Sequence, residues 1–185
     1  GYRFPAGVDE AGRGPLAGPV VAAAVILPPE YENPGIRDSK KLSPSQRERL
    51  FHRIVADASS YAVACAGPGE IDELNVLRAS LLAMRRAVAD LSVPADFLYV
   101  DGIHPVPWGV PQEALVRGDS RCLSVAAASV LAKVSRDRMM EEYDRLYPGY
   151  GFAAHKGYPT RGHLEALRRF GPSPIHRRTF KGVPA

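Results

Sequence analysis

Acidic residues stand beside glycine at three places where a predicted strand ends or a helix begins. These acids, which are far apart in the chain, are Asp9, Glu10, Asp101 and Asp119. Ligands collect at strand ends in α/β sheets, so the carboxylates could converge on one spot. Carboxylates gathered without His or Cys favour hard cations such as Mg²⁺ or Mn²⁺ over zinc. The pattern therefore predicts a divalent-metal site.

Each acid also has a structural interpretation. Taken singly, Asp101 is better explained as the start of a turn, because a glycine follows it, and Asp119 is better explained as the cap of the following helix. Asp9 and Glu10 differ, because two adjacent acids after an apolar strand add nothing to packing and repel each other. Neighbouring strand residues point to opposite faces, so both can bind metal only if the chain already turns at Glu10. Asp137 is a rival fourth ligand, but its position within a helix favours a salt bridge with a neighbouring arginine.

A glycine-rich loop, Gly12-Arg13-Gly14, follows the first pair of acids. Glycines allow the backbone to approach a ligand closely, and the arginine adds a charged donor. The loop is neither a P-loop nor a dinucleotide fingerprint, because no Gly-Lys-Ser/Thr follows it and the next element is a strand. It is a candidate site for a nucleic-acid backbone, and a tight hairpin turn explains the bare pattern equally well.

The elements that must position these residues alternate between strands and helices. We expect strands at 4–9, 19–27, 60–66 and 97–100, and helices from 43 onward and over 70–91, 120–146 and 160–170. Ser43 and Gln46 have the spacing of a capping box around Pro44, which marks one helix start. This order predicts an α/β domain of two or three layers, with the last forty residues as a helical appendage.

Charge is distributed unevenly along the chain. The net charge is +4 overall, but residues 145–185 carry +7 and residues 1–144 carry −3. A basic end on a slightly acidic body favours a polyanionic partner such as nucleic acid, because each Lys or Arg near a phosphate releases counterions. The alternative is a solvated basic face with no partner.

Length and composition exclude several classes of protein. With 185 residues, 45% hydrophobic and 24% charged, the chain fits one globular domain rather than a disordered protein. The longest apolar stretch, residues 19–27, is about half of what a membrane-spanning helix needs. No signal peptide is recognisable, and the two cysteines, Cys65 and Cys122, have no metal-type spacing. We therefore expect free thiols and a cytoplasmic protein without membrane attachment.

Several motifs together resemble bacterial ribonuclease HII, the type 2 ribonuclease H. The matching blocks are residues 7–21 (GVDEAGRGPLAGPVV), 38–42 (DSKKL), 100–102 (VDG), 118–120 (GDS), 126–134 (AAASVLAKV), 136–137 (RD), 155–158 (HKGY) and 174–178 (PIHRR). They extend over nearly the whole chain and occur in the family's order. The Gly-Arg-Gly loop is similar to type HII, whereas type HIII carries Gly-Thr-Gly there and an extra N-terminal domain.

The resemblance implies a fold and an activity. The fold is α/β, a ribonuclease H-like central mixed sheet flanked by helices, with a small C-terminal helical extension. Residues 1–145 would form the catalytic domain, and residues 146–185 a basic helical extension that contacts nucleic acid. The activity would be endonucleolytic cleavage of the RNA strand of RNA–DNA hybrids and incision 5′ of single ribonucleotides in duplex DNA. The products would carry 3′-hydroxyl and 5′-phosphate ends, as in primer removal and ribonucleotide excision repair.

The resemblance also implies roles for individual residues. Asp9, Glu10, Asp101 and Asp119 match the family's catalytic acids, which hold two divalent cations, Mg²⁺ or Mn²⁺. Two such ions can stabilise the attacking and leaving oxygens of phosphodiester hydrolysis. The residues that match the family's substrate-binding positions are Gly12, Arg13, Gly14, Lys40 and Tyr158. The glycine loop would read the ribose 2′-hydroxyl, the tyrosine would stack on the next deoxyribose, and the lysine would contact phosphate.

Other interpretations remain open beside this one. A nuclease of the same fold could cut DNA without needing a ribonucleotide, and a catalytically silent protein could bind nucleic acid only. His155, His163 and His176 lack ligand spacing, and we expect them at the surface or against phosphate rather than in catalysis. No apolar stripe remains unassigned, so we expect a monomer.

Overall fold

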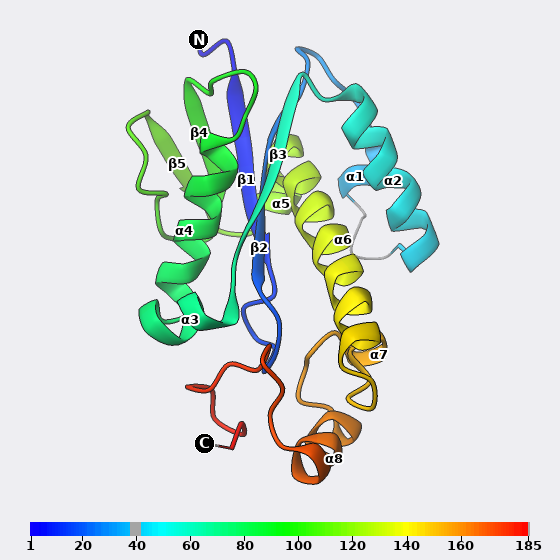
Figure 1. Ribbon diagram of the computed structural model, residues 1–185. Coiled ribbons are helices and arrows are strands. Elements are labelled where there is room, and N and C mark those ends of the chain that lie inside the picture. Colours follow the sequence, from blue (N-terminus) through cyan, green and yellow to red (C-terminus); the bar gives the residue numbers. More distant parts are fainter. Residues whose placement is uncertain (38–41, 185) are drawn as a thin grey trace.

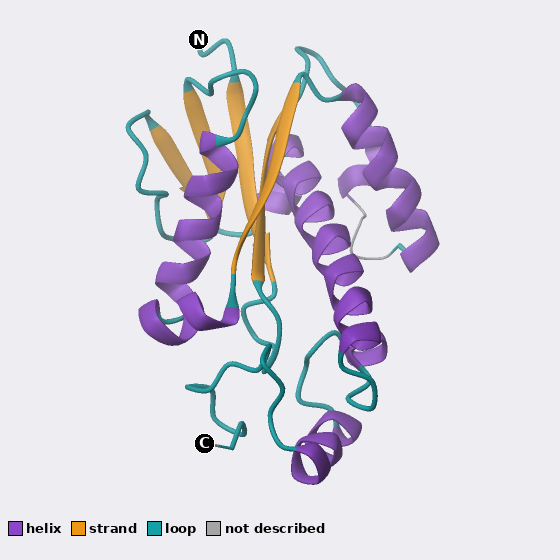
Figure 2. Cartoon of the chain, viewed as in Figure 1, coloured by secondary structure: helices purple, strands orange, loops and turns teal. Residues whose placement is uncertain are grey.

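The structure is a computed structural model that describes residues 1–37 and 42–184. Lys40, predicted to contact phosphate, therefore lies outside the described residues. Within them, a five-stranded sheet is flanked by helices on both faces (Figure 1, Figure 2). In spatial order its strands are β3 (Ser60–Ala66), β2 (Val20–Ile26), β1 (Pro5–Ala11), β4 (Phe97–Asp101) and β5 (Gln112–Leu115). The predicted α/β class with a mixed sheet is confirmed.

The sheet brings its acids to one edge because of its mixed topology. β1, β2 and β3 pair antiparallel, whereas β4 pairs parallel with β1 and β5 pairs parallel with β4. The carboxyl ends of β1, β4 and β5 therefore point the same way. Asp9 and Glu10 lie near the carboxyl end of β1, Asp101 is the last residue of β4, and Asp119 follows β5.

The central strand β2 shows how the layers are held together. All seven of its residues are buried, and alternate side chains face opposite layers. Val20, Ala22, Ala24 and Ile26 belong to the core beneath α4 (Val76–Ala89). Ala23 and Val25 belong to the core beneath α6 (Leu123–Leu146), which α1 (Pro34–Arg37) and α2 (Pro44–Asp57) flank. A strand buried on both faces reads as a continuous apolar run, as its sequence does.

Two long predicted helices are each divided into two. The segment 70–91 consists of α3 (Pro68–Leu74) and α4, separated by Asn75 with φ +72°, whose side chain accepts hydrogen bonds from the first amides of α4. The segment 120–146 consists of α5 (Gly118–Arg121) and α6, separated by Cys122 in an extended conformation. The capping box that opens α2 is present as predicted, with Ser43 Oγ accepting from the Gln46 amide.

The C-terminal part packs on the end of the sheet rather than standing apart. It contains α7 (Phe152–His155) and α8 (Arg161–Phe170), at the lower end of Figure 1. A small apolar cluster joins Phe152 and Ile175 of this part to Ala17 and to Met140 of α6. None of the helices in the described part of the chain has the length and apolar content that crossing a bilayer requires.

Candidate active site

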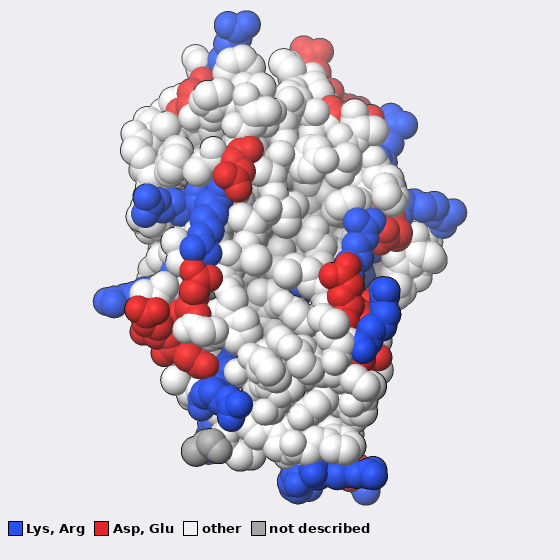
Figure 3. Space-filling view, in the orientation of Figure 1, with Lys and Arg blue, Asp and Glu red and all other residues white. Residues whose placement is uncertain are grey.

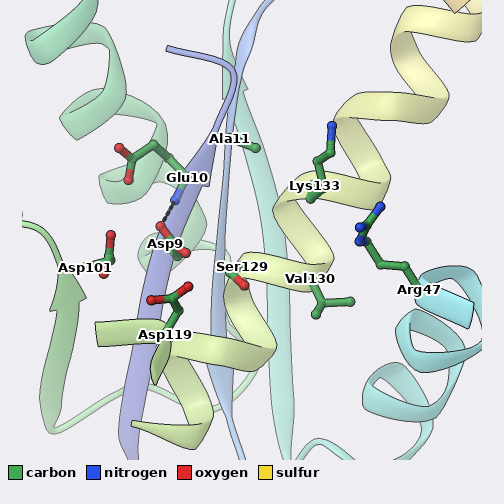
Figure 4. A pocket seen from close by; sticks show the side chains of 9 residues that line it. All are labelled: Asp9, Glu10, Ala11, Arg47, Asp101, Asp119, Ser129, Val130 and Lys133. Carbon is green, nitrogen blue, oxygen red and sulfur yellow. Dashed lines mark hydrogen bonds between the residues drawn. The ribbon is translucent and has the colours of Figure 1, made fainter. Parts of the chain in front are cut away.

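The four predicted acids line one cavity at the carboxyl edge of the sheet. The cavity has a volume of about 370 Å³, and its wall contains Asp9, Glu10, Ala11, Arg47, Asp101, Asp119, Ser129, Val130 and Lys133. Figure 4 shows the side chains of Asp9, Asp101 and Asp119 facing one another from β1, β4 and α5. Acids that are distant in the sequence are thus brought together, as their positions at strand ends predict.

Backbone amides hold two of these carboxylates in place. The Glu10 amide donates to Asp9 Oδ1 at 2.7 Å, and the Gly118 amide donates to Asp101 Oδ1 at 2.6 Å. A β-carbon at Gly118 would lie 3.2 Å from Asp101 Oδ1 and 3.1 Å from the Leu115 side chain, so the absence of a side chain permits this close approach. The bond ties the start of α5 to the end of β4, and this brings Asp119 beside Asp101.

Burial and neighbouring negative charges raise the pKa values of two of the acids, Asp9 and Glu10. Burial raises the pKa of Asp9 well above its ordinary value, and the negative charges of Glu10 and Asp101 raise it further. Burial also raises the pKa of Glu10, although the Arg13 guanidinium opposes this shift. A cluster of carboxylates with these pKa shifts is destabilised when fully ionised, and a bound cation would relieve that repulsion.

The four acids fit a hard divalent cation, because their donor atoms are all oxygens and they line one cavity. Every candidate ligand is a carboxylate oxygen, and Glu10 Oε2 is buried with no hydrogen-bond partner among the described residues. Across residues 1–37 and 42–184, however, no three His, Cys, Asp or Glu side chains converge closely enough to hold one ion. Glu10 is still inside β1, so the chain does not turn there, and this side chain leaves the strand on the opposite side from Asp9. Holding one ion with three of the acids therefore requires side-chain rotation.

Two basic residues stand on the opposite wall of the cavity (Figure 4). They are Arg47 of α2, whose Nη2 donates to the Leu42 carbonyl at 3.0 Å, and Lys133 of α6. Lys133 Nζ is 2.7 Å from Asp137 Oδ1, one helical turn away. Asp137 thus forms a salt bridge as expected, but with a lysine rather than an arginine, and it does not line this cavity. Sequence reasoning missed Arg47, because only the docking of α2 against α6 brings it here.

The glycine-rich loop lies beside the acids and against Tyr158. Gly12 has φ +96°, and a β-carbon there would lie 2.0 Å from Arg136 Nε, so only glycine fits. Arg13 reaches Glu10 Oε1 at 3.5 Å. A β-carbon at Gly14 would lie 3.5 Å from Cε1 of Tyr158, whose side chain is exposed. The structure therefore brings together the loop and the tyrosine that the sequence singles out.

The histidines correct one expectation. His163 and His176 are fully buried and bonded to each other, with 2.9 Å between their Nε2 atoms. The prediction of surface histidines is wrong for these two, because both rings pack against Phe152 of α7 and against each other. Arg177 is also buried, so it does not belong to the basic surface that the charge distribution suggests.

Comparison with known proteins decides the family. The family model described as Ribonuclease HII matches residues 6–183. The chain belongs to the ribonuclease HII family. Curated ribonuclease HII proteins from Syntrophotalea carbinolica and Geotalea uraniireducens are 61% and 57% identical over 99% of this chain and over 88% and 85% of their own lengths. The crystal structure of ribonuclease H2 from Pyrococcus horikoshii superimposes with a TM-score of 0.81 at 31% identity, covering 97% of this chain and 95% of that one.

Membership confirms the resemblance and the fold that the motifs predict. As a ribonuclease HII, the protein is a ribonuclease H-type hydrolase that acts on RNA–DNA hybrids, in a family that depends on divalent metal. The same membership excludes the catalytically silent binder. The assignment of individual ligand and substrate-contacting residues stays a prediction.

Proposed function

We propose that this ribonuclease HII reads RNA-to-DNA junctions. It hydrolyses the RNA strand of hybrids and also incises 5′ of a single ribonucleotide embedded in duplex DNA, leaving 3′-hydroxyl and 5′-phosphate ends. This activity would serve ribonucleotide excision repair and primer removal. Asp9, Glu10, Asp101 and Asp119 are the metal-holding acids in this proposal.

The observation that carries the proposal is the closeness of Gly14 to the ring of Tyr158, whose Cε1 would lie 3.5 Å from a β-carbon on the glycine. The 2′-hydroxyl distinguishes RNA from DNA, and a glycine loop lets main-chain groups reach it. A tyrosine packed directly beside that loop would receive the next sugar, and a ring stacked flat on it favours deoxyribose. Together, the loop and the ring would read the change from ribose to deoxyribose rather than a base sequence.

The remaining residues of the cavity fit hydrolysis of a phosphodiester. Two divalent cations, when bound, supply stabilisation of charge on the attacking and leaving oxygens. The acids hold these cations, and backbone donors keep Asp9 and Asp101 oriented. Arg47 and Lys133 face the acids across the cavity and are suited to bind the substrate phosphate.

The basic extension, residues 146–185, would contact the nucleic acid farther from the cut. Its exposed cations include Arg168 and Arg169 at the end of α8, and basic side chains gather over this end of the molecule in Figure 3. Exposed cations on the last helix can bind phosphates at low cost in desolvation. This division into a catalytic domain of residues 1–145 and a binding extension is part of the proposal.

The test is cleavage of an end-labelled DNA duplex that contains one ribonucleotide, beside an all-DNA duplex of the same sequence. Wild type and Asp101→Asn are each incubated with Mg²⁺, with Mn²⁺ or with EDTA. We expect one metal-dependent cut on the 5′ side of the ribonucleotide, absent in the mutant and in the all-DNA control. Cutting of the all-DNA duplex would instead favour a DNA nuclease of the same fold. No cut at the ribonucleotide, by a protein that cleaves a long RNA–DNA hybrid in the same buffer, would contradict the junction activity.

A further inference from the structure

The segment after α8 runs back along the loop that follows β1. We call residues 173–177 the C-terminal brace. Its backbone pairs with the chain just beyond the glycine-rich loop: the Gly18 amide donates to the Ile175 carbonyl, and the Arg177 amide donates to the Leu16 carbonyl, both at 2.9 Å. Two neighbouring side chains of the brace, His176 and Arg177, then extend in different directions.

Arg177 binds the glycine-rich loop from beneath. Its side chain is fully buried, with Nη1 donating to the Arg13 carbonyl at 2.8 Å, Nη2 to the Gly12 carbonyl and Nε to the Gly18 carbonyl at 3.0 Å. All three acceptors are main-chain oxygens. Burial lowers the pKa of Arg177 to about 9, so the group is still protonated at neutral pH. A buried cation is expensive to maintain, and this one fixes the direction of two loop carbonyls.

His176 holds Tyr158 through a second histidine. His176 Nδ1 accepts from the Ser173 amide at 2.9 Å, so the ring proton is on Nε2, which donates to His163 Nε2. His163 must then carry its proton on Nδ1, which donates to the Tyr158 carbonyl at 2.9 Å. The bonding partners therefore define one neutral tautomer for each ring. The chain of bonds begins at the brace and ends at the backbone of Tyr158.

A second buried arginine completes the frame on the other side. Arg136 of α6 donates to the carbonyls of Ala17 and Lys156, at 3.1 Å and 3.0 Å. The Leu16 amide donates to the Gly157 carbonyl at 2.8 Å, directly before the tyrosine. The chain around Tyr158 is thus fastened to the same segment between β1 and β2, residues 16–18, that the brace holds.

We propose that the C-terminal brace is a positioning element for junction selectivity, in which Arg177 orients the glycine-rich loop and His176 orients Tyr158. Two adjacent residues would thereby set the spacing between the group that reads ribose and the group that reads deoxyribose. The inference rests on the proposed function, because it assigns a role in selectivity only if these two elements read the junction. Neither Arg177 nor His176 touches the substrate in this proposal.

The geometry makes the spacing sensitive to small changes. A displacement of about 1 Å at a positioning group can lower a rate by about a hundredfold. Lysine at position 177 keeps a charge but replaces a planar fork by a point donor, so it cannot reach three carbonyls in the same way. Phenylalanine at position 176 keeps a ring but removes the hydrogen bonds of both ring nitrogens. Each change loosens one of the two reading elements.

The test compares kcat/KM for a single-ribonucleotide duplex with kcat/KM for a long RNA–DNA hybrid. The variants are Arg177→Lys, His176→Phe and the milder Ser173→Ala, which removes only the hydroxyl facing His176 Nδ1 at 2.8 Å. Matched controls are Arg85→Lys and His52→Phe, both at exposed positions. We expect the ratio to fall by about tenfold in Arg177→Lys and His176→Phe and by less in Ser173→Ala, with the controls unchanged.

The outcomes separate this inference from the proposed function. If wild type does not cut at the single ribonucleotide, the proposed function fails and the inference fails with it. If wild type cuts there and the variants keep its ratio of the two kcat/KM values, only the inference is overturned, even where their melting temperatures fall. If Arg177→Lys and His176→Phe do not fold, Ser173→Ala decides, and an unchanged ratio in that variant contradicts the proposal.

Discussion

Gly14 and Tyr158 lie so close together that a β-carbon on the glycine would be 3.5 Å from the tyrosine Cε1. This distance is ordinary van der Waals contact, so the backbone tolerates a methyl group there. The relationship contrasts with Gly12 in the same loop, where a β-carbon would lie 2.0 Å from Arg136 Nε and 2.8 Å from the Pro19 carbonyl oxygen. Packing therefore requires glycine at position 12 but not at position 14, which fits the proposed role of Gly14 in ligand access.

Alanine substitutions should separate packing from ligand access. Gly14→Ala is expected to keep the melting temperature of wild type but to lower kcat/KM on a single-ribonucleotide duplex, because its methyl group occupies space beside Tyr158. Gly12→Ala is expected to lower the free energy of unfolding by about 2–4 kcal/mol, because of its clash and its φ of +96°. Denaturant unfolding and steady-state kinetics check both. A strongly destabilised Gly14→Ala would contradict the assignment.

The ring of Tyr158, rather than its hydroxyl, should carry the preference for deoxyribose. Tyr158→Phe is expected to keep most junction cleavage, whereas Tyr158→Ala is expected to lower the ratio of junction to long-hybrid cleavage by about tenfold through lost stacking. The side chain is 46% exposed, so neither change should affect the core. The measurement is kcat/KM on the two substrates, and equal ratios for all three proteins would rule out a role in stacking.

Removal of a buried acid should increase stability while abolishing activity. Asp9→Asn is expected to lower cleavage by about three orders of magnitude and, in EDTA at pH 7, to raise the free energy of unfolding by about 1 kcal/mol. The sign follows from the raised pKa of Asp9: the folded state binds this proton more tightly, so ionisation at neutral pH destabilises it.

Thermal denaturation with and without Mg²⁺ provides the accompanying measurement. Mg²⁺ should raise the melting temperature of wild type and have a smaller effect on Asp9→Asn. Asp96→Asn is a matched control, because Asp96 accepts hydrogen bonds from the Arg3 and Phe4 amides and is not part of the cavity wall. An Asp9→Asn protein less stable than wild type in EDTA would contradict the argument.

The buried histidines should make the protein less stable in acid. Burial lowers the pKa of His176 from 6.5 to about 4 and lowers the pKa of His163, with Arg178 and His155 among the nearby groups that disfavour charge. Both histidines of the unfolded chain therefore become protonated below about pH 6.5, whereas His176 of the folded chain becomes protonated only at about pH 4. Stability present above pH 6.5 is lost over this range, by up to about 3 kcal/mol for His176.

Denaturant unfolding between pH 4.5 and 7 tests this expectation. Carboxylates also titrate in this range, so the informative quantity is the difference in slope between wild type and His176→Phe. We expect the variant to be less stable at pH 7 and to lose less stability on acidification. Identical slopes would show that the histidines do not contribute.

Arg47 should contribute to substrate binding from the wall opposite the acids. Arg47→Ala is expected to raise KM severalfold. It should also reduce the slope of the logarithm of the binding constant against the logarithm of salt concentration by the amount that corresponds to about one phosphate contact. Arg49→Ala, exposed on the same helix, is the matched control. Fluorescence anisotropy over a salt series provides the slope, and equal slopes for the two variants would contradict a phosphate contact.

The acids could be predicted from the sequence because their position depends on local rules. Asp9, Glu10 and Asp101 lie at the ends of apolar strands, Asp119 lies at the start of a helix, and parallel strands end at the same edge. β5 was not predicted, because Gln112–Leu115 has neither alternation nor β-branched residues. Its place depends on pairing with β4, a contact that no local pattern contains. The split of the helix at Asn75 likewise depends on a positive φ that is selected by packing.

The buried arginines and histidines were beyond prediction for a different reason. Their partners are main-chain carbonyls and each other, and a carbonyl has no sequence signature. In the sequence, Arg177 is one of several cations in a basic segment. Only the folded structure shows that it donates to the carbonyls of Gly12 and Arg13. A charged residue in a basic segment can therefore be structural, and only its long-range partners reveal this.

The late position of the buried Arg177 in the chain affects how the loop forms during synthesis. All four acids leave the ribosome well before this residue, so the nascent sheet can collapse while the carbonyls of Gly12 and Arg13 still lack their donor. The loop is completed only when residues 173–177 have been synthesised. A chain released before Ser173 would contain every acid and yet lack the contact that holds the loop. If the loop reads ribose as proposed, the nascent chain completes its metal-holding acids before it completes the support of the loop that discriminates between sugars.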